Sequence, residues 1–258
     1  MQTSGWKKFF KLYTKEMWEL RPEIFIVLAA TLVIDILLYF KAQEFPALAV
    51  APLMMILGLA AFLPFISSFK LLGREWNFNT VYLLLSLPVR GGSILGSKLL
   101  ALLSQYIIGT VVVSAGGVIL AFLLFPEPGL LETLRTLGID TRIQTMLSSG
   151  LLFFLMTLAG MAYVICISFF SQLLGRLVKR FSSLVTAVVF VATFWLMGKA
   201  MNPLWQQLEN YNQVHLNQYN FSLAALNQVL GISTLIMMAG AAIVFIAAVL
   251  VYNHKIEL

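Results

Sequence analysis

The segment from Gly231 to Tyr252 reads GISTLIMMAGAAIVFIAAVLVY and contains no charged side chain. An apolar stretch of about 17 to 25 residues is long enough to cross the hydrocarbon core of a bilayer as a helix. Only a helix satisfies its own backbone hydrogen bonds within one segment there, because hydrocarbon offers no partners. This segment therefore predicts a transmembrane helix and indicates that lipid surrounds much of the chain.

The same pattern recurs along the sequence. Six apolar stretches of sufficient length occur near residues 24–40, 46–69, 99–125, 146–174, 184–201 and 231–252. The composition agrees, since 60% of the 258 residues are hydrophobic and 11% are charged, whereas a soluble domain has roughly a quarter charged residues. The low charge excludes a soluble or disordered protein, and the single cysteine, Cys166, excludes a disulfide scaffold. We predict an all-α integral membrane protein with six transmembrane helices.

Residues 1–23 are predicted to form an interfacial amphipathic helix rather than a signal peptide. Apolar side chains from Trp6 to Leu20 recur at helical spacing on one face, and the lysines lie largely off that face. A helix of this kind lies in the plane of the lipid headgroups. Residues 24–258 then form the six-span transmembrane domain.

The distribution of cations predicts the topology. Most of the 17 Lys and Arg residues fall in the N-terminal segment, in the loops 70–98 and 175–183, and in the C-terminal tail. With six spans these segments share one side, which the positive-inside rule assigns to the cytoplasm. Both termini are therefore expected to be cytoplasmic, in a cell membrane. The net charge of +6 is a signal of topology and of affinity for anionic lipids, and nucleic acid is not an expected partner.

Two connections are longer than a turn requires, and long loops in compact domains are usually functional. The cytoplasmic loop 70–98 is predicted to contain a coupling helix at 74–86 that Pro88 ends, while Arg90 and Lys98 anchor the next span at the headgroups. The outer loop 202–230 mixes aromatic residues with Asn and Gln, which favours an interfacial or re-entrant hairpin.

No catalytic or metal-binding motif is evident. Residues 91–98, GGSILGSK, approach a phosphate-binding loop, but that motif needs Lys directly after the second Gly and Ser or Thr next. His215 and His254 have no evident acid or nucleophile partner, and with one cysteine they do not make a zinc site. The chain is therefore not expected to be an enzyme or to hold a nucleotide, metal or other cofactor.

Asp35 is the one carboxylate inside a predicted span, about five residues from the outer end. An ionisable residue there is costly and is a functional candidate. Two interpretations stay open: a structural ion pair with Lys41 or Lys199, or a role with substrate or protons. A secondary transporter would usually have several such groups, often in repeated halves.

The loop 70–98 also resembles a known family. The order of residues directly after the second span is similar to that of the type-2 class of ABC exporter permeases, at Arg74-Glu75, Thr80, Leu83 to Leu85, Pro88-Val89, Ile94 and Lys98. The interfacial helix, the six spans and the long last outer loop extend the resemblance over nearly the whole chain. Asn79 stands where this pattern commonly has Gly.

The resemblance implies a permease dimer, of like or paralogous chains, in a bacterial cytoplasmic membrane. It also implies two separate ATP-binding subunits per complex, which bind ATP and Mg²⁺ and carry out the hydrolysis. Each would bind the coupling helix and a second cytoplasmic loop, at Arg74, Glu75, Trp76, Asn77, Phe78, Asn79, Thr80, Arg176, Lys179 and Arg180. The expected function is therefore the transmembrane permease subunit of an ATP-driven exporter.

In similar permeases the substrate pathway involves spans two and five at the dimer interface. Those spans carry Phe and Met at helical spacing: Phe62, Phe65, Phe69, Phe190, Phe194 and Met197. Such side chains make adaptable apolar walls, although they also serve ordinary helix packing and lipid contact. The expected cargo is apolar or amphipathic: a membrane-active or antimicrobial peptide, a lipid or a drug. Two alternatives stay open, an ion-coupled carrier or channel without an ATPase, and a non-transporting membrane anchor or immunity protein.

Overall fold

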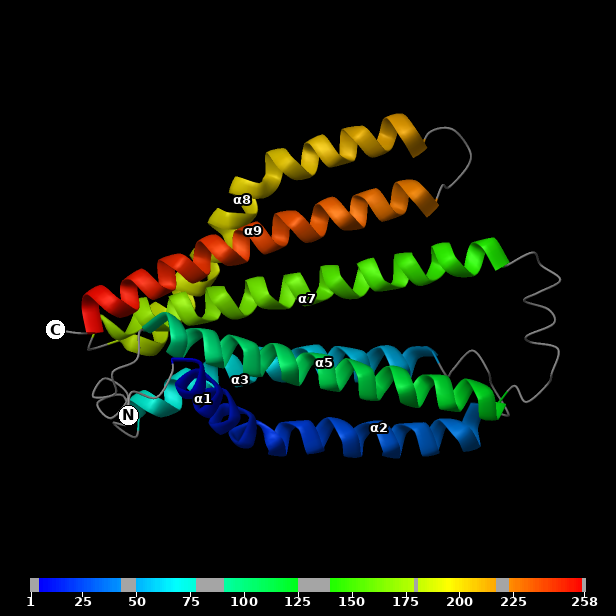
Figure 1. Cartoon of the computed structure of the whole chain (residues 1–258), viewed down its shortest axis with the longest axis horizontal. Coiled ribbons are helices and arrows are strands. Elements are labelled where there is room, and N and C mark those ends of the chain that lie inside the picture. The colour runs from blue at the N-terminus through cyan, green and yellow to red at the C-terminus, as the bar shows by residue number, and fades with distance from the viewer. Residues whose placement is uncertain are drawn as a thin grey trace. The chain divides into compact units, whose positions relative to one another are not determined.

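The computed structural model describes residues 5–42, 50–77, 91–124, 140–178, 181–216 and 223–256. Over these ranges the chain forms seven helices and no strand, which confirms the prediction of an all-α protein at this level. The helices are α1 Gly5–Glu19, α2 Arg21–Ala42, α3 Val50–Asn77, α5 Gly91–Leu124, α7 Asp140–Arg176, α8 Ser182–Leu216 and α9 Leu223–Ile256 (Figure 1).

Four of the described helices are long and apolar enough to cross a membrane, in the segments Arg21–Phe40, Gly91–Leu120, Ser148–Arg176 and Asn227–His254. They coincide with the first, third, fourth and sixth predicted spans. Residues 50–69 of the second predicted span belong to α3, and the fifth lies within α8, whose apolar segment Ser182–Leu196 is shorter. The transmembrane character is thus supported, and the number of six spans stays a prediction.

The helices extend into both long connections. Residues 70–77 continue α3 without a break, and residues 91–98 already belong to α5, so both ends of the predicted coupling loop are helical extensions of its neighbours. The centre of that loop, 78–90, lies outside the described residues. In the outer connection α8 continues to Leu216 and α9 begins at Leu223.

One compact unit contains α1, α2, α3 and α5. Helix α5 packs against the other three, and Val27, Ala60 and Val113 form a buried apolar core between α2, α3 and α5. Gly109 allows the close approach of α5 to α3, because a Cβ at this position would lie 3.3 Å from the Cβ of Ala60. The Tyr13 hydroxyl shares a hydrogen bond of 3.0 Å with Ser104, which fastens α1 to α5.

A turn at Leu20 separates α1 from α2, and it is held by backbone hydrogen bonds on both sides. Pro22 then falls in the first turn of α2, where its missing N–H leaves no intrahelical bond unmade. Leu20 alone therefore separates α1 from the first apolar helix.

The second compact unit contains α7, α8 and α9. Helix α7 packs against both neighbours and carries a run of buried side chains from Ile165 to Phe169, including the free thiol of Cys166. Near the start of α9, Asn227 accepts a hydrogen bond of 2.6 Å from the Ser149 hydroxyl and donates one of 3.2 Å to Ser148. These polar bonds join α9 to α7 in addition to the apolar packing between the two helices.

Candidate functional site

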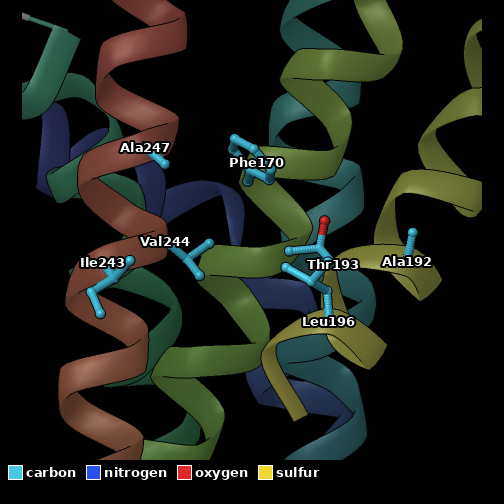
Figure 2. A pocket seen from close by; sticks show the side chains of 7 residues that line it. All are labelled: Phe170, Ala192, Thr193, Leu196, Ile243, Val244 and Ala247. Carbon is cyan, nitrogen blue, oxygen red and sulfur yellow. The ribbon is translucent and has the colours of Figure 1, made fainter. Parts of the chain in front are cut away.

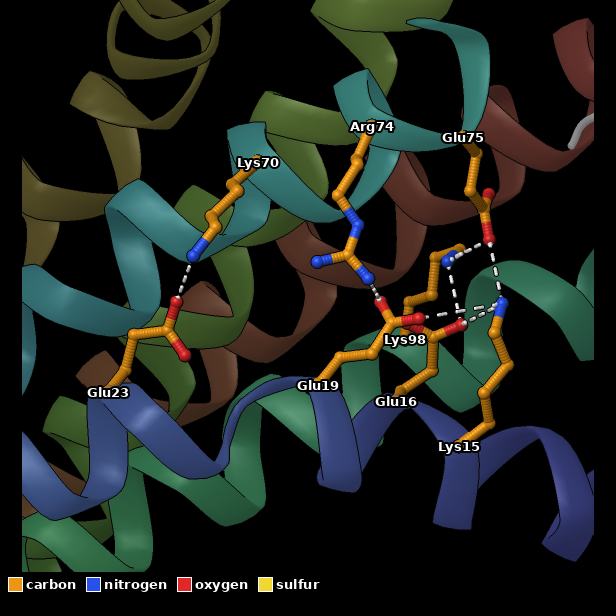
Figure 3. A network of polar contacts seen from close by, with 8 residues as sticks. All are labelled: Lys15, Glu16, Glu19, Glu23, Lys70, Arg74, Glu75 and Lys98. Carbon is orange, nitrogen blue, oxygen red and sulfur yellow. Dashed lines mark hydrogen bonds and ion pairs between the residues drawn. The ribbon is translucent and has the colours of Figure 1, made fainter. Parts of the chain in front are cut away.

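Charged side chains of α1, α2, α3 and α5 meet in one network, which we call the basal ion cluster (Figure 3). Four cations and four carboxylates make it up: Lys15, Lys70, Arg74, Lys98, Glu16, Glu19, Glu23 and Glu75. Its formal charge is zero. Such balance is what makes it possible to bury charged groups, since an uncompensated charge is costly to remove from water.

Lys98 is the centre of the basal ion cluster. Its side chain is 1% exposed, and its ammonium group donates hydrogen bonds of 2.8 Å to Glu16 and 2.6 Å to Glu75. These two carboxylates come from α1 and α3, 82 and 23 residues away along the chain. Lys98 therefore joins α1 and α3 to the first turns of α5. The expectation that it anchors a span at the headgroups is wrong, because its side chain is enclosed by protein and has carboxylate partners there.

Glu75 is the carboxylate that α3 contributes to the contact with Lys98. Burial raises the pKa of its carboxyl group above the ordinary value, and the charge of Lys98 opposes part of that rise. Lys15 lies farther off, at 3.7 Å from Glu75 and 3.8 Å from Glu16, and its side chain is about half exposed. A partly exposed pair of that kind contributes little to stability, so the tight contacts to Lys98 dominate.

Two outer pairs extend the cluster along α3. Arg74 is 2.8 Å from Glu19, and Lys70 is 2.5 Å from Glu23. Lys70 and Arg74 are four residues apart on α3 and therefore lie on the same face. Glu19 and Glu23 are also four residues apart, on either side of the turn at Leu20, so the two ion pairs lie next to each other. They fasten α3 to the junction of α1 and α2 (Figure 3).

The residues predicted to bind an ATP-binding subunit have different placements. Arg74 and Glu75 lie in the basal ion cluster, and Arg176 is exposed at the end of α7. Trp76 and Asn77 end α3, and their side chains lie outside the description. The rest, Phe78, Asn79, Thr80, Lys179 and Arg180, lie outside the described residues. Their contact with a partner stays a prediction.

Sequence reasoning missed three of the four carboxylates of this cluster. Glu16, Glu19 and Glu23 recur at helical spacing, and so do Lys70 and Arg74. Those spacings could have identified two facing charged rows. They could not have identified Lys98, because a single lysine at the start of an apolar span also fits a headgroup contact.

The aromatic residues predicted to line a pathway form two separate stripes. On α3 the rings of Phe62, Phe65 and Phe69 follow one another at centroid distances of 6.0 and 5.3 Å. On α8 Phe190 and Phe194 stack at 6.4 Å. Phe62 and Phe194 are at least half exposed, and the side chain of Met197 lies outside the description. The stripes belong to different compact units, so a shared pathway stays a prediction.

A groove of about 320 Å³ lies among α7, α8 and α9 (Figure 2). Its lining residues are Phe170, Ala192, Thr193, Leu196, Ile243, Val244 and Ala247. Thr193 supplies the one hydroxyl among them, and no lining side chain is ionisable. A lining of this type can bind an apolar group and provides no acid, base or nucleophile for catalysis.

Asp35 lines a second, larger groove between α2 and α5. Two lysines were proposed as its ionic partners. The ammonium group of Lys199 lies 5.2 Å from the ring centre of Trp195. The side chain of Lys41 is not among those that the structure describes. Across the ranges that are described, Asp35 makes no ion pair. In the same ranges no three His, Cys, Asp or Glu side chains are grouped so that they could hold a metal ion.

Comparison of the chain with protein-family models, curated proteins and solved structures finds no match. The class therefore follows from the fold alone. Seven helices without a strand in the described residues, four of them apolar enough to span, define an all-α, multi-pass membrane protein.

Proposed function

We propose that this chain is the transmembrane permease subunit of an ATP-driven ABC exporter. In this proposal it forms a dimer in a bacterial cytoplasmic membrane, with six spans and both termini in the cytoplasm. Two partner subunits bind ATP and Mg²⁺ and perform the hydrolysis, so the chain itself is not an enzyme. The exported substrate is apolar or amphipathic: a membrane-active peptide, a lipid or a drug.

The basal ion cluster is the observation that supports this proposal most directly. Loop 78–90 leaves the end of α3 and enters the start of α5, and Lys98 joins these two helix ends to each other and to α1. The ammonium group of Lys98 contacts a carboxylate of α1 at 2.8 Å and one of α3 at 2.6 Å, so these buried contacts link the three helices. A partner that displaced the loop would therefore move α1, α3 and α5 together. That is the mechanical property that a coupling element needs.

The two aromatic stripes support the substrate class. Phe62 and Phe194 present large apolar side chains with about half or more of their surface uncovered. The described part of α3 before Lys70 and the apolar segment of α8 contain no charged side chain. Walls of this kind favour an apolar surface over a hydrophilic solute.

The test is reconstitution with an ATP-binding subunit purified together with the tagged full-length chain. The expected result is ATP hydrolysis that the permease stimulates and that Phe78→Ala reduces to the rate of the ATP-binding subunit alone. Phe153→Ala is the matched control, because Phe153 is 55% exposed on α7 and lies far along the chain from the coupling loop. Full transport by the chain without any ATP-binding subunit would contradict the proposal.

Asp35, which makes no ion pair with a described residue, favours one alternative, an ion-coupled carrier or channel that acts alone. That function requires flux in ATP-free liposomes that follows an imposed ion gradient and disappears in Asp35→Asn. A membrane anchor or immunity protein would instead bind a partner through loop 70–98 and show no flux under either condition.

A further inference from the structure

The groove that contains Asp35 has a volume of about 560 Å³ and lies between α2 and α5, which run side by side (Figure 1). Small residues of α5, Ala115 and Gly116, are part of its lining, and large apolar side chains such as Phe40 and Ile119 are part of its rim. Phe40 is 70% and Ile119 60% exposed, so the groove opens outward from the described unit. A volume of this size is within the range of small-molecule sites, which is about 300 to 1,000 Å³.

Asp35 supplies the one carboxyl group among the lining residues given for this groove, where Thr31 and Tyr39 supply hydroxyl groups. The Thr31 hydroxyl donates a hydrogen bond of 2.8 Å to the carbonyl oxygen of Val27, so it is already used. Oδ1 of Asp35 is covered by protein and accepts no hydrogen bond from the described residues. Oδ2 lies against Gly116, where a Cβ would collide with it, so the carboxyl group is seated at the contact between the two helices.

Among the described side chains, none forms an ion pair with this carboxylate. The basal ion cluster is remote, since Asp35 follows Glu23 by twelve positions, or about 18 Å along α2. A carboxylate in apolar surroundings is costly without a counter-charge. The missing charge can be supplied from outside the chain.

We propose that the groove between α2 and α5 binds a cationic amphiphile, whose ammonium group pairs with Asp35 and whose apolar body lies along the groove. The position fits, because Asp35 is five residues before Phe40, the last residue of the apolar segment, or about 7 to 8 Å below its end. An ammonium group attached directly to an apolar body reaches that depth. An aminophospholipid is the poorer occupant, since its phosphate would enter a groove in which no described residue is basic.

Binding of dodecylammonium to the full-length chain tests the proposal, in nanodiscs of zwitterionic lipid and with empty nanodiscs as background. Dodecanol, with the same alkyl chain and no charge, is the matched ligand. A charge-assisted hydrogen bond predicts that dodecylammonium binds at least about tenfold more tightly than dodecanol. Asp35→Asn removes the charge at constant shape and is expected to abolish that difference, while dodecanol binding is unchanged. Asp140→Asn, in the other unit, is expected to preserve it.

Equal affinity of the wild-type chain for the two ligands would overturn the proposal, because it would mean that the carboxyl group is protonated or does not face the ligand. Equal loss of both ligands in Asp35→Asn would also overturn it, because the residue would then act only in packing. If Asp35→Asn does not fold, Ala115→Leu fills the groove instead and is expected to weaken both ligands. The alternative occupant is a second copy of this chain. Nanodiscs that hold one chain test it: tenfold selective binding of dodecylammonium there excludes the second copy, and absence of binding overturns the proposal. The assay contains neither ATP nor an ATP-binding subunit, so its result is independent of the proposed exporter function.

Discussion

The same compact unit covers carboxyl oxygen atoms in two places, and the two places differ in the groups that surround these atoms. In the basal ion cluster Glu16 and Glu75 surround the ammonium group of Lys98 at 2.8 and 2.6 Å. In the groove between α2 and α5, Asp35 has a covered oxygen atom and no described partner. A compensated charge holds helices together, whereas an uncompensated charge is retained at a cost and points to a ligand. The difference separates a structural site from a candidate binding site.

The largest effect is expected from Lys98→Met. This change leaves Glu16 and Glu75 buried beside each other without their cation, which should lower the free energy of unfolding by about 3 to 5 kcal/mol. The measurement is denaturant unfolding in micelles, followed by circular dichroism. Lys7→Met is the control, since Lys7 is exposed and a surface substitution changes stability by about 0.5 kcal/mol or less. Similar losses in both variants would show that Lys98 has no special role.

A smaller loss, about 1 to 3 kcal/mol, is expected from Gly116→Ala, because the new methyl group meets the Asp35 carboxylate and lies 3.1 Å from Thr31. The same change should cost less in a chain that already carries Asp35→Ala, since the colliding oxygen is then absent. A double-mutant cycle on unfolding free energies measures this coupling. Additive effects would place the Asp35 carboxyl group away from α5.

Glu75→Gln is expected to change how stability depends on pH. The pKa of Glu75 is raised in the folded chain, so in the interval above the ordinary value of 4.5 the folded state binds more protons than the unfolded state. This residue's contribution is therefore fully present below 4.5 and is lost as pH rises through the raised pKa. Subtracting the unfolding free energies of Glu75→Gln from those of the wild-type chain should give a difference that declines in that interval. Parallel pH profiles for the two chains would contradict the assignment.

The smallest effect is expected from Asp35→Asn, in contrast to Lys98→Met. Because the carboxylate has no described partner, removing its charge breaks no ion pair and relieves a desolvation cost. The unfolding free energy should stay within about 1 kcal/mol of the wild-type value or increase. The same denaturant titration measures it. A loss of several kcal/mol would mean that Asp35 has a structural cation and that the comparison fails.

Apolar runs predicted well which segments are helical. The four segments that could span a membrane were all recognised from hydropathy, because hydrocarbon imposes both the length and the hydrogen bonding of a helix. The positions at which helices begin and end were harder to predict from the sequence. Residues 70–77 and 91–98 carry charged and small residues typical of a loop, yet they continue α3 and α5, and Arg74, Glu75 and Lys98 within them form ion pairs with side chains of α1.

The candidate sites were predicted only in part. Asp35 was identified because a carboxylate within an apolar run is conspicuous in any sequence. Glu75 was a functional candidate through the resemblance to a permease family, but its intramolecular bond to Lys98 was not foreseen. The groove beside Asp35 could not be anticipated either, because its lining comes from two segments about 80 positions apart.

Composition and local periodicity were enough to predict a lipid environment, an all-α class and the segments in which charged residues fall. Which of those charges are compensated depends on how the helices pack. Whether Lys98 lies among lipid headgroups or between two carboxylates depends on how α1 and α3 fold back on α5. The free energy of a buried charge depends on groups within a few ångströms, and the chain brings those groups from distant positions.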